Sequence, residues 1–179
     1  MRLMFQRATS FNQDIGSWNI SSVTDMSYML SGASQFNQDI STWDVSGVTT
    51  MRSMFQGASS FDIDISTWNI SSVTDMVFML NGATSFNQDL CAWGDKFPYD
   101  NAAGIFGGSN CTFEGIAPRE SDKAPFCASS CTDFVSLVLQ YIFRALLLLI
   151  SSSLGSISNA NIPSTASQTR VVLMDSKLL

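Results

Sequence analysis

The chain contains no histidine among its 179 residues. This removes the commonest general base, the histidine-activated serine and cysteine nucleophiles, and imidazole metal ligands. Residues 1–94 also lack glutamate and carry three cations, Arg2, Arg7 and Arg52, against eight aspartates. With a formal net charge of -6 for the whole chain, this segment repels phosphate backbones. We therefore expect no enzyme activity, no cofactor and no nucleic-acid partner.

Tryptophan occurs four times in the chain, and the four copies are spaced 25 residues apart. Aspartate repeats at the same interval, and one unit reads roughly F-N-Q-D-I-S-T-W-N-I-S-S-V-T-D-M-x-x-M-L-x-G-A-x-S. A fixed period of this length indicates coils that cannot bury an apolar face alone and must stack on one another. The sequence therefore predicts a four-copy repeat domain over residues 1–94. Its two series are Trp18, Trp43, Trp68, Trp93 and Asp14, Asp39, Asp64, Asp89.

Each coil is expected to contain one short helix and one short strand. The apolar residues Met26, Met29, Leu30 and Ala33 recur at helical spacing. Residues 15–20 alternate as a strand, with Trp18 pointing inward. Together these patterns predict an α/β solenoid with a parallel sheet. A core role for the tryptophan series is favoured over a ligand-stacking surface, because a shared core requires large residues in every coil.

The aspartate series lies where the chain is expected to turn from helix to strand. Asn and Asp side chains can accept hydrogen bonds from unpaired turn amides, which is a structural role. Two functional alternatives remain open. Stacked carboxylates could bind calcium, or Asp39 and Asp64 could act as the carboxylate pair of a carbohydrate-active enzyme. Equal environments in every coil argue against one acid and one base.

Positions that differ between copies form the candidate binding face. Some lie on the outward side of the predicted helices, and others are small polar residues on the strand face. Such a face could hydrogen-bond a glycan or another protein, although a solvated surface explains it equally well. The candidate residues are Tyr28, Arg52, Phe78, Thr42, Asp44, Thr67 and Asn69.

Four cysteines, Cys91, Cys111, Cys127 and Cys131, fall near or beyond the end of the last repeat. Their even number in an irregular segment favours disulfides formed in an oxidising compartment. The rival interpretation is a four-thiolate zinc site, but the paired C-x2-C spacing of such sites is absent. Among three pairings we favour Cys91–Cys111 with Cys127–Cys131, because it links neighbours in sequence.

Three sequons centred on Asn19, Asn69 and Asn110 agree with secretion. The amino terminus has no signal-peptide pattern. It begins in phase with the interior of a coil, so we expect a fragment or a start codon placed too far downstream.

Beyond residue 94 the repeat pattern ends. Residues 95–131 are expected to form a disulfide-bearing cap, because the last coil would otherwise expose apolar surface. Residues 132–154 are expected to form a hydrophobic helix, and the run from Phe134 to Ile150 is a marginal candidate for a membrane segment. Residues 155–179 are rich in Ser, Asn and Thr and are expected to be disordered.

The repeat W-[ND]-[IV]-S-x-V-T-x-M-x-x-M-[FL]-x-x-A-x-x-F-N-x-D-[IL] resembles the BspA-like leucine-rich-repeat surface proteins over residues 1–94. The resemblance implies a leucine-rich-repeat-like, right-handed stack of coils with a cysteine-bearing C-terminal cap. It also implies an extracellular, cell-surface or membrane-anchored chain that adheres to protein or matrix. No ligand-binding residues are defined that could be carried over.

We therefore expect a non-enzymatic, secreted or surface repeat protein that binds protein or glycan. The alternatives are a carbohydrate-active enzyme using paired aspartates and a purely structural spacer.

Overall fold

The computed structural model describes residues 1–115, 118–121, 125–129 and 131. The chain divides into two compact units, Met1–Asp133 and Phe134–Leu179. The second unit, the predicted hydrophobic helix (132–154) and the predicted disordered tail (155–179) lie outside the described residues. Within the described ranges, no helix combines the length and the apolar character needed to cross a membrane.

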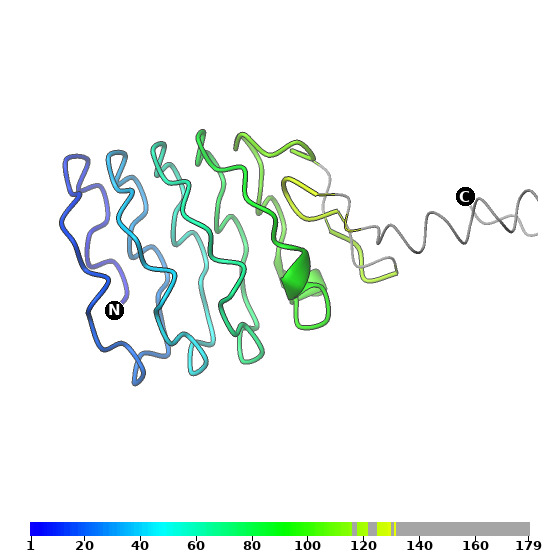
Figure 1. The fold of residues 1–179 in the computed structure, drawn as a ribbon, viewed down its shortest axis with the longest axis horizontal. Helices are drawn as coiled ribbons and strands as arrows, with labels where there is room; N and C mark the ends of the chain where they lie inside the picture. The colour runs from blue at the N-terminus through cyan, green and yellow to red at the C-terminus, as the bar shows by residue number, and fades with distance from the viewer. Residues whose placement is uncertain (116–117, 122–124, 130, 132–179) are drawn as a thin grey trace, which may run out of the picture. The chain divides into compact units, whose positions relative to one another are not determined.

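In the first unit, successive repeats form loops that lie side by side (Figure 1). Backbone amides on one side of each loop donate to carbonyls of the following loop, as Tyr28 does to Arg52 at 2.9 Å. On the other side the direction reverses, and Thr49 donates to Thr24 at 2.8 Å. Among the described residues, parallel pairing between loops consists of isolated bridges, Asp25 with Thr50 and Thr50 with Asp75.

The predicted α/β solenoid, a leucine-rich-repeat-like right-handed stack with a strand and a helix in each repeat, is wrong. The described residues contain no α-helix and no strand, and their regular elements are two 3-10 helices, η1 (Cys91–Trp93) and η2 (Tyr99–Asn101). The expected helix fails because Tyr28 has a φ of 57°, in the left-handed region. The expected strand fails because the Trp18 amide donates to the Ile15 carbonyl at 3.1 Å and closes a turn.

The apolar residues at helical spacing nevertheless point inward. Met26, Met29, Leu30 and Ala33 are fully buried, although the backbone that carries them is a series of turns. Hydrogen bonds to the neighbouring loops replace the bonds that a helix would make within itself.

Aromatic side chains form columns that run through the core from loop to loop. The ring centroids of Phe61 and Phe86 lie 5.8 Å apart at an interplanar angle of 5°, and those of Trp43 and Trp68 lie 6.4 Å apart at 11°. Trp43 is 4% exposed, and its Nε1 donates to the Ile15 carbonyl at 3.1 Å. The expected core role therefore holds for these two tryptophans.

The two ends of the tryptophan series differ from its middle. Trp18, in the first loop, is 38% exposed. Trp93, in η1, is 1% exposed, and within the described part of the chain its Nε1 has no hydrogen-bond partner. Only inner members of the series are thus both stacked and hydrogen-bonded.

Asn and Asp side chains stabilise the turns in two ways. Every member of the aspartate series accepts a hydrogen bond from the amide two residues later in its own loop, as Asp14 does from Gly16 at 2.9 Å. A second column bonds the next loop, because Oδ1 of Asn12 accepts from the Asn37 amide at 2.9 Å and Asn37 accepts from Asp62 at 3.0 Å.

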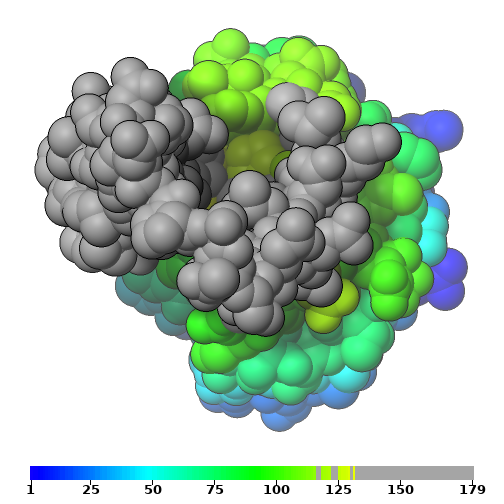
Figure 2. Space-filling model, turned by 90° about the vertical axis from the view of Figure 1, so that its right-hand side faces the viewer, coloured from blue at the N-terminus to red at the C-terminus, as the bar shows by residue number. Residues whose placement is uncertain are grey.

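The closing segment of the first unit contains two disulfides, Cys91–Cys131 and Cys111–Cys127. Figure 2 views the unit from this end. The pairing expected from sequence, Cys91–Cys111 with Cys127–Cys131, is wrong. Residues 102–107 form a further loop that accepts hydrogen bonds from the preceding repeat. Cys111 therefore lies one repeat beyond Phe86, inside the core and 6% exposed, where buried Cys127 reaches it.

Candidate functional site

Each of the first four loops carries one residue other than glycine in the left-handed backbone region at the same repeat position. The φ values are 63° at Leu3, 57° at Tyr28, 52° at Ser53 and 56° at Phe78. This conformation costs an L-residue on the order of 1–2 kcal/mol relative to glycine or a right-handed backbone. We call these four residues the left-handed row.

A second left-handed position, four residues later, is occupied differently. Gly32, Gly57 and Gly82 have φ values of 73°, 70° and 72°, and Arg7 is the exception in the first loop. The chain thus relieves strain with glycine at one left-handed position and keeps side chains at the other. The further loop formed by residues 102–107, which we call the added loop, has a glycine even at the first left-handed position: Gly104, with φ 63°.

From Tyr28 onward, large and small residues alternate at this repeat position, in the order Tyr28, Ser53, Phe78 and Gly104. Phe78 lies against Gly104 of the next loop, where a Cβ would be only 2.5 Å from Phe78 Cε1. Tyr28 likewise comes one loop before a small residue, Ser53, which is 2% exposed. Phe78 itself remains 41% exposed, and Tyr28 is half-buried. Two residues of the row are thus aromatic, and each is followed by a small residue at the same position of the next loop.

The third outward candidate, Arg52, lies one position before Ser53. Its Nε donates to Oδ2 of Asp75 at 2.8 Å, and the two side chains are 40% and 26% exposed. Such a partly exposed pair contributes little to stability, typically about 0–1 kcal/mol. The guanidinium keeps further N–H donors beyond the one in this bond.

The remaining predicted binding residues occupy other turns of the loops, and all four are exposed: Thr42, Asp44, Thr67 and Asn69. Three of these residues make hydrogen bonds within the fold, and one of them is Thr67, whose hydroxyl donates to the Ser41 carbonyl at 3.4 Å. Oδ1 of Asp44 accepts from the amide and the hydroxyl of Ser46, at 3.1 and 2.6 Å, and these bonds hold the pKa of Asp44 below its ordinary value. Asn69 accepts from the Ser71 amide at 3.3 Å.

A shallow hollow of about 440 Å³ lies over the turns that carry the aspartate series. Asp39, Asp62 and Asp64 line it together with Gln88. Hydrogen bonds from the Ser41 hydroxyl and amide hold the pKa of Asp39 below its ordinary value, whereas a catalytic acid at neutral pH needs a raised pKa. Asp39 and Asp64 also make the same turn contact in their own loops.

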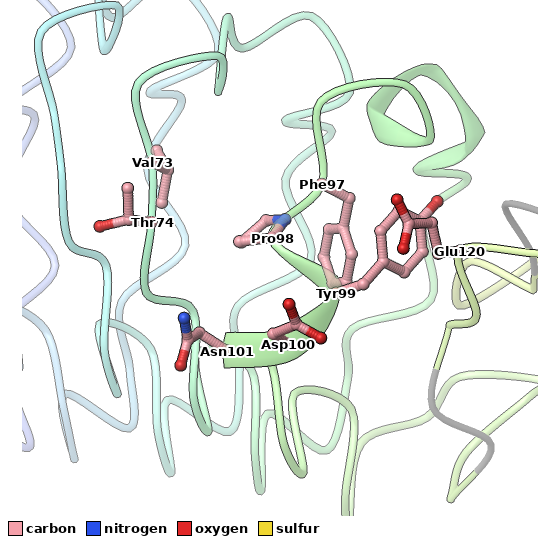
Figure 3. Close-up of a pocket in the computed structure, with 8 residues that line it drawn as sticks. All are labelled: Val73, Thr74, Phe97, Pro98, Tyr99, Asp100, Asn101 and Glu120. Carbon is pink, nitrogen blue, oxygen red and sulfur yellow. The ribbon is translucent and has the colours of Figure 1, made fainter.

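A second open pocket, of about 340 Å³, lies around η2. Figure 3 shows Phe97, Pro98 and Tyr99 on one side, with the carboxylates of Asp100 and Glu120 beside them. The Tyr99 hydroxyl donates to the Gly94 carbonyl at 2.8 Å. The sequence does not indicate this pocket, because residues 97–101 carry no repeat pattern and no motif.

One cluster in the described residues has metal-ligand geometry, formed by Asp89, Cys91 and Cys131. Cys91 and Cys131 are joined in a disulfide, so neither sulfur is available as the thiolate that a zinc site requires. The four-thiolate alternative fails for the same reason, since the other two cysteines are also paired.

All three sequon asparagines, Asn19, Asn69 and Asn110, are exposed. Asn19 Oδ1 accepts from both the amide and the hydroxyl of Ser21, at 3.2 and 2.8 Å. Their side chains are accessible, and whether they carry glycans stays a prediction.

Comparison with known families gives one match. Residues 1–111 match the family described as "Mycoplasma protein of unknown function, DUF285". The chain belongs to this family. The DUF285 match ends at Cys111, and its description names no activity. No curated protein and no solved structure matches the chain.

Proposed function

We propose that this DUF285 chain is a non-enzymatic binding module, displayed outside the cell or on its surface, that recognises a protein or a glycan. The proposal rests on the different roles of two sets of residues in each loop. Residues that repeat are buried or cap turns, whereas Tyr28, Arg52 and Phe78 are outward residues that differ between loops. Positions not required for stacking are available for recognition.

An extracellular location is supported by two disulfides in a small unit, since such bonds persist in oxidising compartments. The resemblance to BspA-like surface proteins points the same way, and the family match is compatible with it. The predicted membrane segment from Phe134 to Ile150 lies outside the described residues, so the proposal does not rest on it.

The enzymatic alternative has less support. The carboxylates Asp39 and Asp64 cap equivalent turns, and the lowered pKa of Asp39 disfavours it as an acid. Hydrolysis of a polysaccharide by the purified chain, abolished by Asp39→Asn or Asp64→Asn, would restore this alternative.

The proposal predicts two results. Antibodies against residues 1–131 should label intact cells of the source organism without permeabilisation. The purified, disulfide-bonded chain should bind the outside of cells or extracellular matrix. The triple variant Tyr28→Ala, Arg52→Ala, Phe78→Ala should bind less. Its melting temperature should stay within a few degrees of wild type, as expected for outward residues. Ser10→Ala with Ser22→Ala is a matched pair of exposed substitutions outside the predicted binding residues and should leave binding unchanged. Labelling only after permeabilisation, or undiminished binding by the triple variant, would contradict the proposal.

A further inference from the structure

The left-handed row retains costly side chains where glycine would fit without strain. The same chain uses glycine at the equivalent position of the added loop, Gly104, and at the second left-handed position of three loops. Backbone strain of this kind persists only where neighbouring structure enforces it, and it clusters at binding and active sites. Tyr28 and Phe78 are the two aromatic residues of the row that stay partly or largely exposed, and they are therefore candidates for a binding role.

The two aromatic residues are two loops apart. Hydrogen-bonded neighbouring segments are spaced by about 4.8 Å, so two steps give a separation of roughly 10 Å along the row. The loop between them carries Ser53 in the row and Arg52 one residue earlier, and Arg52 pairs with Asp75 of the next loop at 2.8 Å. The charges of this pair cancel, and it offers both N–H donors and carboxylate acceptors. We call the segment of the row from Tyr28 to Phe78, with the adjacent Arg52–Asp75 pair, the aromatic line; exposed Leu3 precedes it by one loop.

We propose that this line binds an extended, electrically neutral polysaccharide, with Tyr28 and Phe78 stacking on alternate sugar units. This deepens, and rests on, the proposed role as a surface binding module. A pyranose ring has an apolar C–H face that packs on an aromatic ring, and hydroxyls at its rim that hydrogen-bond to paired donors and acceptors. Each sugar unit of an extended chain advances by about one loop step, so alternate units meet the two rings.

Charge and shape favour this ligand over other classes. The chain has a net charge of -6, which disfavours anionic glycans and nucleic acids. Stable protein partners generally bury more than about 1,000 Å² around a well-packed central cluster. The row is narrow, and the two hollows described above lie at other residues.

The test is affinity electrophoresis of the oxidised chain in gels that contain hydroxyethylcellulose, xyloglucan, galactomannan or xylan, followed by calorimetric titration. At least one of these neutral polymers should retard the wild-type chain, and anionic alginate should not. Tyr28→Leu and Phe78→Leu keep apolar bulk but remove the ring, so each should weaken binding about tenfold. The double variant should not be retarded.

Two controls separate binding from folding. Tyr28→Phe keeps the ring and should bind within about twofold of wild type. Trp18→Leu removes an exposed ring that lies outside the row and should leave binding unchanged. If a leucine variant unfolds, Tyr28→Gly removes the ring while relieving the positive φ, and it should fold but bind weakly.

Failure to bind any of the four neutral polymers, equal retardation by alginate, or wild-type binding by the double leucine variant would overturn the inference. If the chain binds cells or matrix through a protein ligand while no polysaccharide retards it, this inference fails and the proposed function stands.

Discussion

Replacing Trp43 by alanine tests whether the aromatic columns hold the loops together. The side chain is 4% exposed, stacks on Trp68 and donates from Nε1 to the Ile15 carbonyl of the preceding loop. Removing a buried tryptophan generally costs about 3–5 kcal/mol of unfolding free energy. The Ile15 carbonyl loses its bond from Nε1 but keeps the one from the Trp18 amide, so this loss adds at most about 1 kcal/mol.

The matched control is Trp18→Ala, because Trp18 occupies the same repeat position but is 38% exposed. For a unit of this size, each kcal/mol lowers the melting temperature by roughly 3–4 °C. We therefore expect Trp43→Ala to lower it by about 10–25 °C and Trp18→Ala by less than half as much. Differential scanning calorimetry of the oxidised protein measures both. Equal shifts, or a shift below about 3 °C for Trp43→Ala, would refute the reasoning.

Three further outcomes are expected. Gly104→Ala should lower the melting temperature by more than Gly115→Ala, because both have positive φ but only the former collides with Phe78; equal shifts in thermal melts would contradict this. Stability should fall as the pH drops below about 4, because the lowered pKa values of Asp39 and Asp44 make the unfolded chain bind more protons there. Melts between pH 6 and pH 2.5 should therefore decline less for Asp39→Asn with Asp44→Asn than for wild type. Peptide mapping without reductant should recover the two disulfides of the closing segment, and recovery of the sequence-neighbour pairing would show that the loop register there is wrong.

The period of the repeat predicts which residues face inward, but it does not predict the backbone that carries them. Met26, Met29 and Leu30 are buried, as an amphipathic pattern requires. A turn can place residues at i, i+3 and i+4 on one side as well as a helix can, and hydropathy alone does not separate the two cases. The decisive feature is the positive φ of Tyr28. No glycine or asparagine marks that position, so the sequence gives no signal for it.

The disulfides illustrate the same limit. Sequence distance favours joining neighbouring cysteines, and it fails because the repeat register continues past residue 94. Cys111 is one repeat beyond Phe86, at a position that is phenylalanine in the earlier loops, and the Thr112 amide donates to Asn87 Oδ1 as the earlier ladder requires. Phe86 and Cys111 are 25 residues apart, so the repeat interval is present in the sequence. The repeat is hard to recognise there because cysteine replaces the phenylalanine of the earlier copies.

The candidate site is formed by side chains that packing and hydrogen bonding between the loops do not use. Hydrogen bonding between loops fixes the backbone at Tyr28, Ser53 and Phe78, whose amides donate to the following loop at 2.9, 2.9 and 3.0 Å. Because the backbone is held by its neighbours, the left-handed conformation survives whatever side chain is present, at a cost of about 1–2 kcal/mol for each residue other than glycine. A surface position can therefore change its side chain without changing the fold. The three loops use this freedom differently, with two aromatic residues and one buried serine, and that difference is why recognition should depend on Tyr28 and Phe78 rather than on the repeat as a whole.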